Sequence, residues 1–213
     1  MTSDDWFRRT TWTDDDRTDF NVRLKRARRH NRPQYLRIQA VHLSGAGNHA
    51  AALELLDRFL EIDDGGIDLA QSQLQRAESL LATGNVDDAI NAFRASLDAE
   101  RNRPNVQTDA WLLFPWFIVE TQAVDLYAEA SDILTEFANH RSPTFPISEY
   151  RFHCVKAVLL AHGDDREQAS VHAKKAVAAS DAKHSGFRYH AKLGLVRDKS
   201  STVHERVCQI ADK

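Results

Sequence analysis

The sequence predicts an all-α protein built from successive pairs of antiparallel helices. Helix-forming residues dominate its 213 positions, and only 8 glycines and 5 prolines interrupt them. A pattern of small and large apolar residues at helical spacing occurs twice, over residues 33–64 and 68–100. A single helix pair cannot bury its apolar face alone, so further helices must stack on it. We therefore expect one helical-repeat domain over residues 1–213.

The two copies of the pattern align at an offset of 37 residues, where Gly47-Asn48 matches Gly84-Asn85. Each glycine permits a positive φ at the end of the first helix, and each asparagine can cap the second helix. The connection Asp63-Asp64-Gly65-Gly66 accounts for the residues beyond a period of about 34. The matching core positions are Ala40 with Ala77, Leu43 with Leu80, Ala52 with Ala89, Leu56 with Phe93, and Leu60 with Leu97.

These two copies resemble the tetratricopeptide repeat family over about 65 residues. They depart from the family pattern at Phe59 and Ser96, where a small alanine is usual, and no proline closes either copy. The resemblance implies a right-handed superhelix of helix pairs, a protein-binding role and no catalytic residues. It also implies that the first helix of each pair lines a concave binding groove. The side chains implied for this groove are Gln34, Arg37, Val41, Gln71, Leu74, Glu78, Tyr150 and His153.

The segment before the repeats, residues 1–32, is expected to be an arm followed by a capping helix. The arm is polar but contains Trp6, Phe7 and Trp12. Thr13, followed by three aspartates, is typical of a helix N-cap. Basic residues end this helix, and this order of charge complements the helix macrodipole.

The segments after the repeats continue the pattern less regularly. Residues 108–140 and 147–181 are predicted to form two divergent helix pairs. In the first pair, Pro115 falls inside an apolar helix and is expected to kink or restart it. In the second pair, the apolar positions fall one residue late, which indicates that Asp165 is inserted at the turn. Residues 182–213 are expected to form an irregular loop and a short C-terminal helix.

Charge is unevenly distributed along the chain. The formal net charge is −3, which argues against a general nucleic-acid binder. Successive segments carry net charges of +3 over residues 1–32, −7 over 33–100, −3 over 101–147 and +4 over 148–213. This pattern fits an ordinary solvated surface. It also fits an acidic surface that attracts a basic partner, or ends that pair with the middle of another copy.

The sequence contains no segment typical of membrane insertion or secretion. Its longest apolar run, broken by Pro115, is far shorter than the roughly 20 residues of a membrane span. The first residues are polar and charged, unlike a secretory signal. The two cysteines, Cys154 and Cys208, form no disulfide framework. We therefore expect a cytoplasmic protein without a membrane partner.

No residue pattern is typical of catalysis, of a metal site or of a cofactor. The ten histidines lack the spacing of H-E-x-x-H, and the cysteines lack that of C-x-x-C. His162 and His172 fall on the two helices of one pair and could approach each other. Neither a nucleophile motif nor a phosphate-binding glycine loop is present. We predict no catalytic residues, no metal and no cofactor.

The segment 184–190 is the most function-like stretch of the sequence. It places aromatic, cationic and imidazole groups in a non-helical loop, where binding residues often occur. The candidates are His184, Phe187, Arg188, Tyr189 and His190. Alternatively, Phe187 and Tyr189 plug the end of the superhelix while Arg188 pairs with an acidic neighbour.

These observations predict a non-catalytic scaffold that binds another protein or a peptide. The binding surface would be the groove, the Trp-containing arm or the loop 184–190. One alternative is a structural protein that associates with itself through its charge pattern. A further alternative is an enzyme or metal protein that uses the irregular C-terminal half, and nucleic-acid binding is the weakest option.

Overall fold

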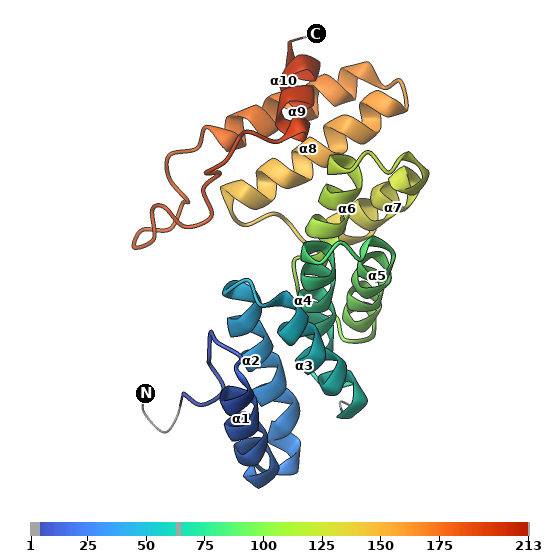
Figure 1. Cartoon of the computed structure of the whole chain (residues 1–213). Coiled ribbons are helices and arrows are strands. Elements are labelled where there is room, and N and C mark those ends of the chain that lie inside the picture. The colour runs from blue at the N-terminus through green and yellow to red at the C-terminus, as the bar shows by residue number, and fades with distance from the viewer. Residues whose placement is uncertain (1–4, 63–64, 213) are drawn as a thin grey trace. The chain divides into compact units, whose positions relative to one another are not determined.

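The computed structural model describes residues 5–62 and 65–212 of the chain (Figure 1). Over these residues, ten α-helices and two short 3₁₀ helices follow one another, and no strand is present. The predicted all-α fold class is therefore confirmed. Asp63 and Asp64 of the expected connection lie outside the described residues.

The contacts divide the chain into two compact units, Met1–Ala110 and Trp111–Lys213, which we describe one at a time. The arrangement of all helix pairs in one superhelical domain stays a prediction.

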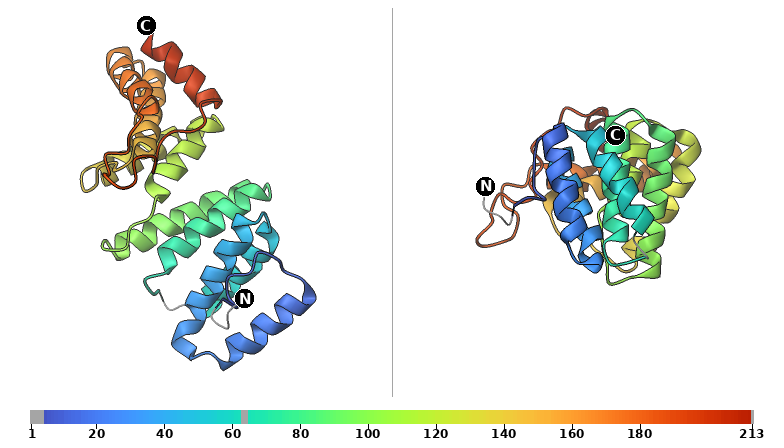
Figure 2. Two further views of the ribbon diagram at one scale, coloured as in Figure 1. Left: turned by 90° about the vertical axis from the view of Figure 1, so that its left-hand side faces the viewer. Right: turned by 60° about the horizontal axis from the view of Figure 1, so that its bottom comes forward.

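Unit 1 contains two antiparallel helix pairs preceded by one helix. The second helix of the first pair packs against the first helix of the second pair. Figure 2 shows the helices of the second pair side by side. The helices are α1 (Asp14–Arg26), η1 (Arg29–Asn31), α2 (Arg32–Gly45), α3 (His49–Ile62), α4 (Leu69–Ala82) and α5 (Val86–Asn102).

Helix α1 covers the apolar face of the first pair. Its side chains Phe20 and Leu24 are buried in one cluster with Leu36 of α2 and Phe59 of α3. The predicted N-cap is observed, since Thr13 and Asp16 form a reciprocal capping box. The apolar residues of α1 recur at helical spacing, so they lie on one face of the helix and pack against the core.

The turn inside each pair of unit 1 has the same geometry. Gly47 and Gly84 have φ angles of 83° and 80°. The next residue donates its backbone N–H to the carbonyl five residues earlier, at 2.8 Å for Asn48 and 2.9 Å for Asn85. These bonds define a Schellman motif, which requires a left-handed residue at its centre and therefore favours glycine.

Unit 2 is built from two more helix pairs and a final helix. Figure 2 shows α8 and α9 side by side, and α10 contacts both of them. The helices are α6 (Ala110–Glu120), η2 (Val124–Leu126), α7 (Tyr127–Ala138), α8 (Pro146–His162), α9 (Arg166–Ser180) and α10 (Thr202–Ala211). Helix α6 continues through Pro115 and does not restart there, because a proline removes only one backbone donor from an otherwise buried, well-packed helix.

Both pairs of unit 2 repeat the same turn without glycine at its centre. The left-handed residue is Gln122 in the first pair, with φ 56°, and Asp164 in the second, with φ 61°. Ala123 and Asp165 then donate N–H groups to carbonyls five residues back, at 3.0 Å in each case. All four turns therefore share one hydrogen-bond pattern.

This geometry corrects the expected insertion at Asp165. Asp164, not the preceding glycine, takes the left-handed position, because aspartate tolerates this conformation better than most residues. Asp165 is then the N-cap of α9, and its side chain accepts a hydrogen bond from the Gln168 amide at 3.1 Å. The apolar positions of α9 fall in register with those of the other pairs.

Residues 181–201, before α10, form an irregular segment as expected. Gly194 anchors this segment to the start of α8, because its carbonyl accepts a hydrogen bond from the Ile147 amide at 2.7 Å. No helix in the described part of the chain is long and apolar enough to cross a membrane.

Candidate functional site

The predicted groove residues of α2 are divided between the surface and a structural ion pair. Gln34 and Val41 are exposed. The Arg37 side chain is only 20% exposed, and its Nε lies 2.8 Å from Oδ1 of Asp68, just before α4. Arg37 thus joins the first helix pair to the start of the second and supports their stacking.

The predicted groove residues of α4 differ in exposure. Leu74 is 4% exposed and belongs to the core of unit 1, so it offers no surface to a ligand. Gln71 is half-buried and Glu78 is exposed. Of the six positions implied for this unit, four therefore present side-chain atoms to solvent: Gln34, Val41, Gln71 and Glu78.

Tyr150, a predicted groove residue of unit 2, is a buried contact between helices. It is 2% exposed, and its hydroxyl lies 3.2 Å from Nδ1 of His204 on α10. The Nε2 atom of the same imidazole lies 3.6 Å from Sγ of Cys208. Burial raises the pKa of Tyr150, which stays protonated and available as a hydrogen-bond donor.

His153, the other predicted groove residue of unit 2, faces α9. Its Nδ1 lies 2.9 Å from Nδ1 of His172. Burial lowers the pKa of His153 to about 4, and the neighbouring His172 and Lys175 contribute in the same direction. Burial also lowers the pKa of His172. Two neutral imidazoles can share one N–H···N hydrogen bond, so the pair binds α8 to α9.

The sequence predicted that His172 could approach His162, but in the structure His172 contacts His153. His162 packs edge-on against Tyr127, with ring centroids 5.0 Å apart, while His172 contacts His153. Within the described chain, no three His, Cys, Asp or Glu side chains are grouped as metal ligands would be.

The loop 184–190 is organised around Ser185, which is buried. Its hydroxyl donates to the His190 carbonyl at 2.6 Å and accepts from the Phe187 amide at 3.1 Å. All five candidate side chains belong to this loop and are exposed to solvent: His184, Phe187, Arg188, Tyr189 and His190.

The aromatic residues of this loop do not bury themselves completely. Phe187 stacks on Phe145 at 5.2 Å between ring centroids but remains 42% exposed. Tyr189 is 82% exposed, and its ring lies 5.4 Å from the Arg188 guanidinium. Arg188 therefore contacts an aromatic ring in its own loop, in place of the acidic neighbour considered from the sequence.

Residues 5–12 of the N-terminal arm pack on the helices of unit 1. The rings of Trp6 and Tyr35 lie 4.9 Å apart, and Trp12 lies 5.3 Å from Phe20. Phe7 contacts the same cluster. The aromatic residues that suggested a binding arm are therefore already engaged within the chain.

A hollow of about 650 Å³ opens where α2 and α4 begin and α3 ends. Among the predicted groove residues, Gln34 is the one that lines it. Two isoleucines beside it are exposed, Ile62 by 49% and Ile67 by 68%. Arg29 and His30 also line the hollow, and both side chains are exposed. Asp68 lines it as well, but its carboxylate is paired with Arg37. The hollow thus combines apolar contact surface with the positive charge of Arg29.

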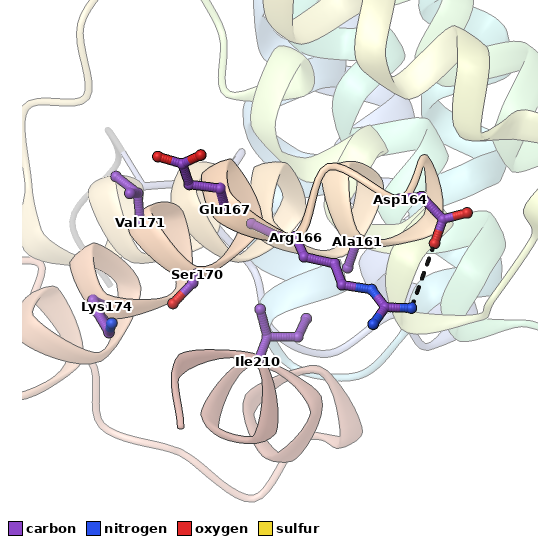
Figure 3. Close-up of a pocket in the computed structure, with 9 residues that line it drawn as sticks. Ala161, Asp164, Arg166, Glu167, Ser170, Val171, Lys174 and Ile210 are labelled. Atoms are coloured by element: carbon purple, nitrogen blue, oxygen red, sulfur yellow. Dashed lines mark ion pairs between the residues drawn. The ribbon is translucent and has the colours of Figure 1, made fainter. Parts of the chain in front are cut away.

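A second depression, of about 850 Å³, lies between α9 and α10 (Figure 3). Ile210 from α10 and Val171 from α9 contribute apolar surface. Arg166 and Asp164 form an ion pair at 3.8 Å, and both side chains are more than four-fifths exposed. Charges of both signs in solvent give this depression little chemical preference.

The prediction from the sequence did not include Arg29, Ile62 and Ile67 as binding residues. They come from three different segments, and only folding places them around one hollow. It also missed Gln39, a fully buried amide on α2. A polar residue within the apolar stripe of a helix was a signal in the sequence, because a buried amide needs hydrogen-bond partners.

The chain was compared with protein-family models, curated proteins and solved structures. The chain matches no family model, and no curated protein or solved structure matches it.

Proposed function

We propose that this chain is a non-catalytic helical-repeat scaffold of the tetratricopeptide type that binds another protein. The four equivalent helix turns support this proposal, since they place similar helix pairs one after another along the chain. Repeated pairs of this kind offer extended surfaces suited to protein partners. A cytoplasmic setting belongs to the same proposal and is supported by two cysteines that are both unpaired.

The observation that carries the proposal is the hollow lined by Gln34. Ile62 and Ile67 remain exposed there, although burying an isoleucine side chain is favourable by about 1.5–3 kcal/mol. Exposed apolar side chains gathered at one hollow are a common sign of an interaction site. We infer that a partner inserts an apolar side chain between them.

The charge around the hollow indicates what flanks that apolar side chain. Arg29 lines the hollow, and three more exposed cations precede it in the sequence at the end of α1 and just after it. The described chain forms no salt bridge to these four residues: Lys25, Arg26, Arg28 and Arg29. Such a cluster attracts acidic groups and accelerates their association. The proposed ligand is therefore a protein segment with an apolar side chain beside acidic residues.

The substitution Ile67→Asp tests this proposal. It adds a negative charge to an exposed turn, so the fold should persist while the apolar contact is lost. We expect partner capture from the native cells to fall by about tenfold or more, since loss of a buried anchor costs about 2 kcal/mol. The matched control is Val86→Asp, at a valine 44% exposed at the start of α5, away from the hollow. Equal capture by both variants and the unmodified chain would remove the basis for this site.

A further inference from the structure

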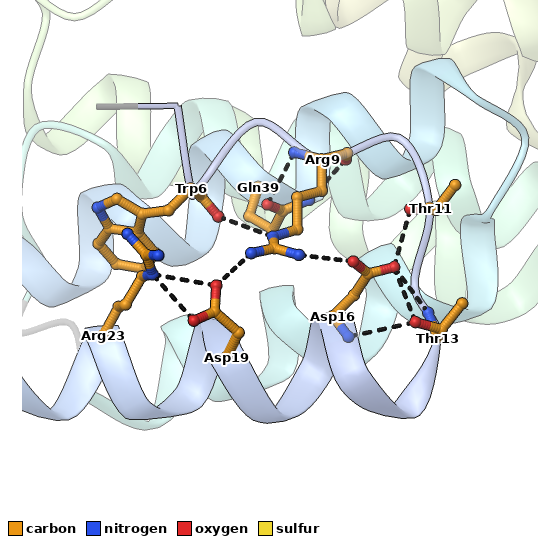
Figure 4. A network of polar contacts seen from close by, with 8 residues as sticks. All are labelled: Trp6, Arg9, Thr11, Thr13, Asp16, Asp19, Arg23 and Gln39. Atoms are coloured by element: carbon orange, nitrogen blue, oxygen red, sulfur yellow. Dashed lines mark hydrogen bonds and ion pairs between the residues drawn. The ribbon is translucent and has the colours of Figure 1, made fainter. Parts of the chain in front are cut away.

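Residues 5–12 of the N-terminal arm lie against α1 and α2 as a turn at Trp6 and Phe7 followed by irregular backbone, and not as a helix (Figure 4). Arg9 donates its backbone N–H to Oε1 of Gln39 at 3.0 Å. The same Gln39 side chain donates through Nε2 to the Arg9 carbonyl at 2.7 Å. One residue further, Nδ2 of Asn48 donates to the Thr10 carbonyl at 3.0 Å. Side-chain amides therefore hold the backbone of the arm.

Two carboxylates of α1 hold the Arg9 side chain. Its Nη1 lies 2.6 Å from Oδ1 of Asp16, and its Nη2 forms a second ion pair with Asp19. The guanidinium is only 17% exposed. A hydrogen bond from the Thr11 hydroxyl lowers the pKa of Asp16 to about 2, helped by Thr13 and Arg9. The carboxylate is therefore ionised at any physiological pH, and the site selects a cation.

Aromatic side chains flank the arginine at equal spacing. Trp6 stands three residues before Arg9 and Trp12 three residues after it. Trp6 packs against Phe20 at 5.3 Å between ring centroids, and Trp12 packs against the same ring at 5.3 Å. The bound segment thus follows the pattern aromatic-x-x-Arg-x-x-aromatic.

We propose that this face of α1 and α2 is a peptide-binding groove that the chain's own arm occupies. Its ligand in a partner protein is a non-helical segment with an arginine three residues from aromatic side chains. Gln39 and Asn48 form hydrogen bonds to backbone atoms, so these contacts do not depend on the ligand's side chains. Asp16 and Asp19 form ion pairs with the arginine side chain and therefore select this residue. The tethered arm competes at a high effective concentration, so it keeps the groove closed until the partner displaces it.

This groove is separate from the hollow beside Ile67, and its test does not depend on that site. The probe is a fluorescent peptide with the sequence of residues 5–12, added to the full chain. The variant Arg9→Glu puts a carboxylate next to Asp16 and Asp19 and should release the arm without removing its aromatic residues. We expect the peptide to bind this variant on the order of tenfold more tightly than the unmodified chain.

The neighbouring substitution Arg8→Glu is the matched control. It makes the same change in charge, but within the described residues Arg8 contacts its own arm: it pairs with Asp5 and lies over the Phe7 ring. Its side chain is 51% exposed. This variant should bind the peptide no better than the unmodified chain does. A peptide that itself carries Arg9→Glu should fail to bind any of the three chains. Equal binding of the two peptides by a folded Arg9→Glu chain would overturn the proposal.

A measurement on the unmodified chain covers the case in which the Arg9→Glu variant does not fold. Excess unlabelled peptide should displace the arm and speed hydrogen exchange at the chain's own Arg9 amide, which Gln39 otherwise protects. Unchanged exchange at saturating peptide would contradict the groove. A dimer of the unmodified chain that Arg9→Glu abolishes and Arg8→Glu preserves would identify the ligand as another copy's arm, and would overturn the proposal of a different partner.

Discussion

Gln122 has a positive φ of 56° at the turn after α6, where the first two pairs have glycine. A side chain in this conformation crowds the backbone and costs roughly 1–2 kcal/mol. The hydrogen bond from Ala123 to Ile118, at 3.0 Å, keeps the turn in place despite this cost. The turn geometry therefore depends on packing of the paired helices as well as on the residue at its centre.

Gln122→Gly is expected to stabilise unit 2 by about 1 kcal/mol, because glycine adopts positive φ without strain. Chemical unfolding monitored by circular dichroism would measure the change. Lys174→Gly, at an exposed position inside α9, is the control and should lower stability by about 1 kcal/mol. Loss of stability in both variants would show that Gln122 is not strained.

Gly194→Ala is expected to destabilise the irregular segment before α10. A Cβ added there would lie 2.6 Å from the Phe145 Cβ, at a residue with φ +66°. Gly186→Ala is a matched control, since its φ is +85° but an added Cβ meets nothing within 4 Å. We expect Gly194→Ala to cost about 1–3 kcal/mol more in unfolding free energy than Gly186→Ala. Equal losses would attribute the whole effect to backbone conformation.

At the scale of the element, the contact between α8 and α9 contains an ionisable pair. His153 and His172 are half-buried and hydrogen-bonded at 2.9 Å, with Lys156 and Lys175 nearby. Burial lowers the pKa of both imidazoles, so protonation of the folded state is unfavourable. Proton uptake is therefore coupled to the stability of this helix pair.

We expect the free energy of unfolding to fall as the pH drops from about 6.5 to about 4. In this range the unfolded chain binds protons that the folded chain, with the pKa of His153 near 4, does not bind. His153→Gln should reduce this dependence on pH, because the glutamine amide can bond His172 without titrating. His140→Gln, at an exposed histidine just after α7, is the control. Urea unfolding at several pH values would measure both, and an unchanged pH dependence in His153→Gln would contradict the explanation.

At the scale of the whole molecule, the uneven charge along the chain remains available for association. Several charges are paired within the protein, such as Arg76 with Asp57 at 2.9 Å and Arg17 with Glu54 at 3.1 Å. In the described structure four basic residues form no such pairs: Lys25, Arg26, Arg28 and Arg29. Residues 33–100, by contrast, carry a net charge of −7. Contacts between the basic end of one copy and the acidic segment of another would be electrostatic and screened by salt.

Self-association would therefore appear as a molar mass that rises when the salt concentration is lowered. Light scattering on concentrated samples at low and high salt measures this directly. The double substitution Arg28→Glu and Arg29→Glu should abolish the rise, because it cancels the net positive charge of the cluster formed by Lys25, Arg26, Arg28 and Arg29. A strict monomer at low salt would exclude the self-assembling alternative.

The sequence by itself determined the helices and the turns that join them. These features depend on a few neighbouring residues, so they can be predicted without knowledge of the tertiary structure. They are the helix periodicity, the N-cap at Thr13 and the glycines at positions 47 and 84. Even the turn at Asp164 depends on local chemistry, although the adjacent glycine drew the prediction one residue away. Whether the pairs form one tetratricopeptide superhelix stays a prediction.

Only the tertiary structure decided which side chains are available for binding. A helix face does not reveal which neighbour covers it, so Leu74 and Tyr150 were predicted in a groove but are buried in the core. Likewise, Arg9 and Gln39 are 30 residues apart and meet only because the arm folds back along α1 and α2. Long-range packing joins residues without any local signal in the sequence, and it is this packing that creates both the hollow beside Ile67 and the groove that holds Arg9.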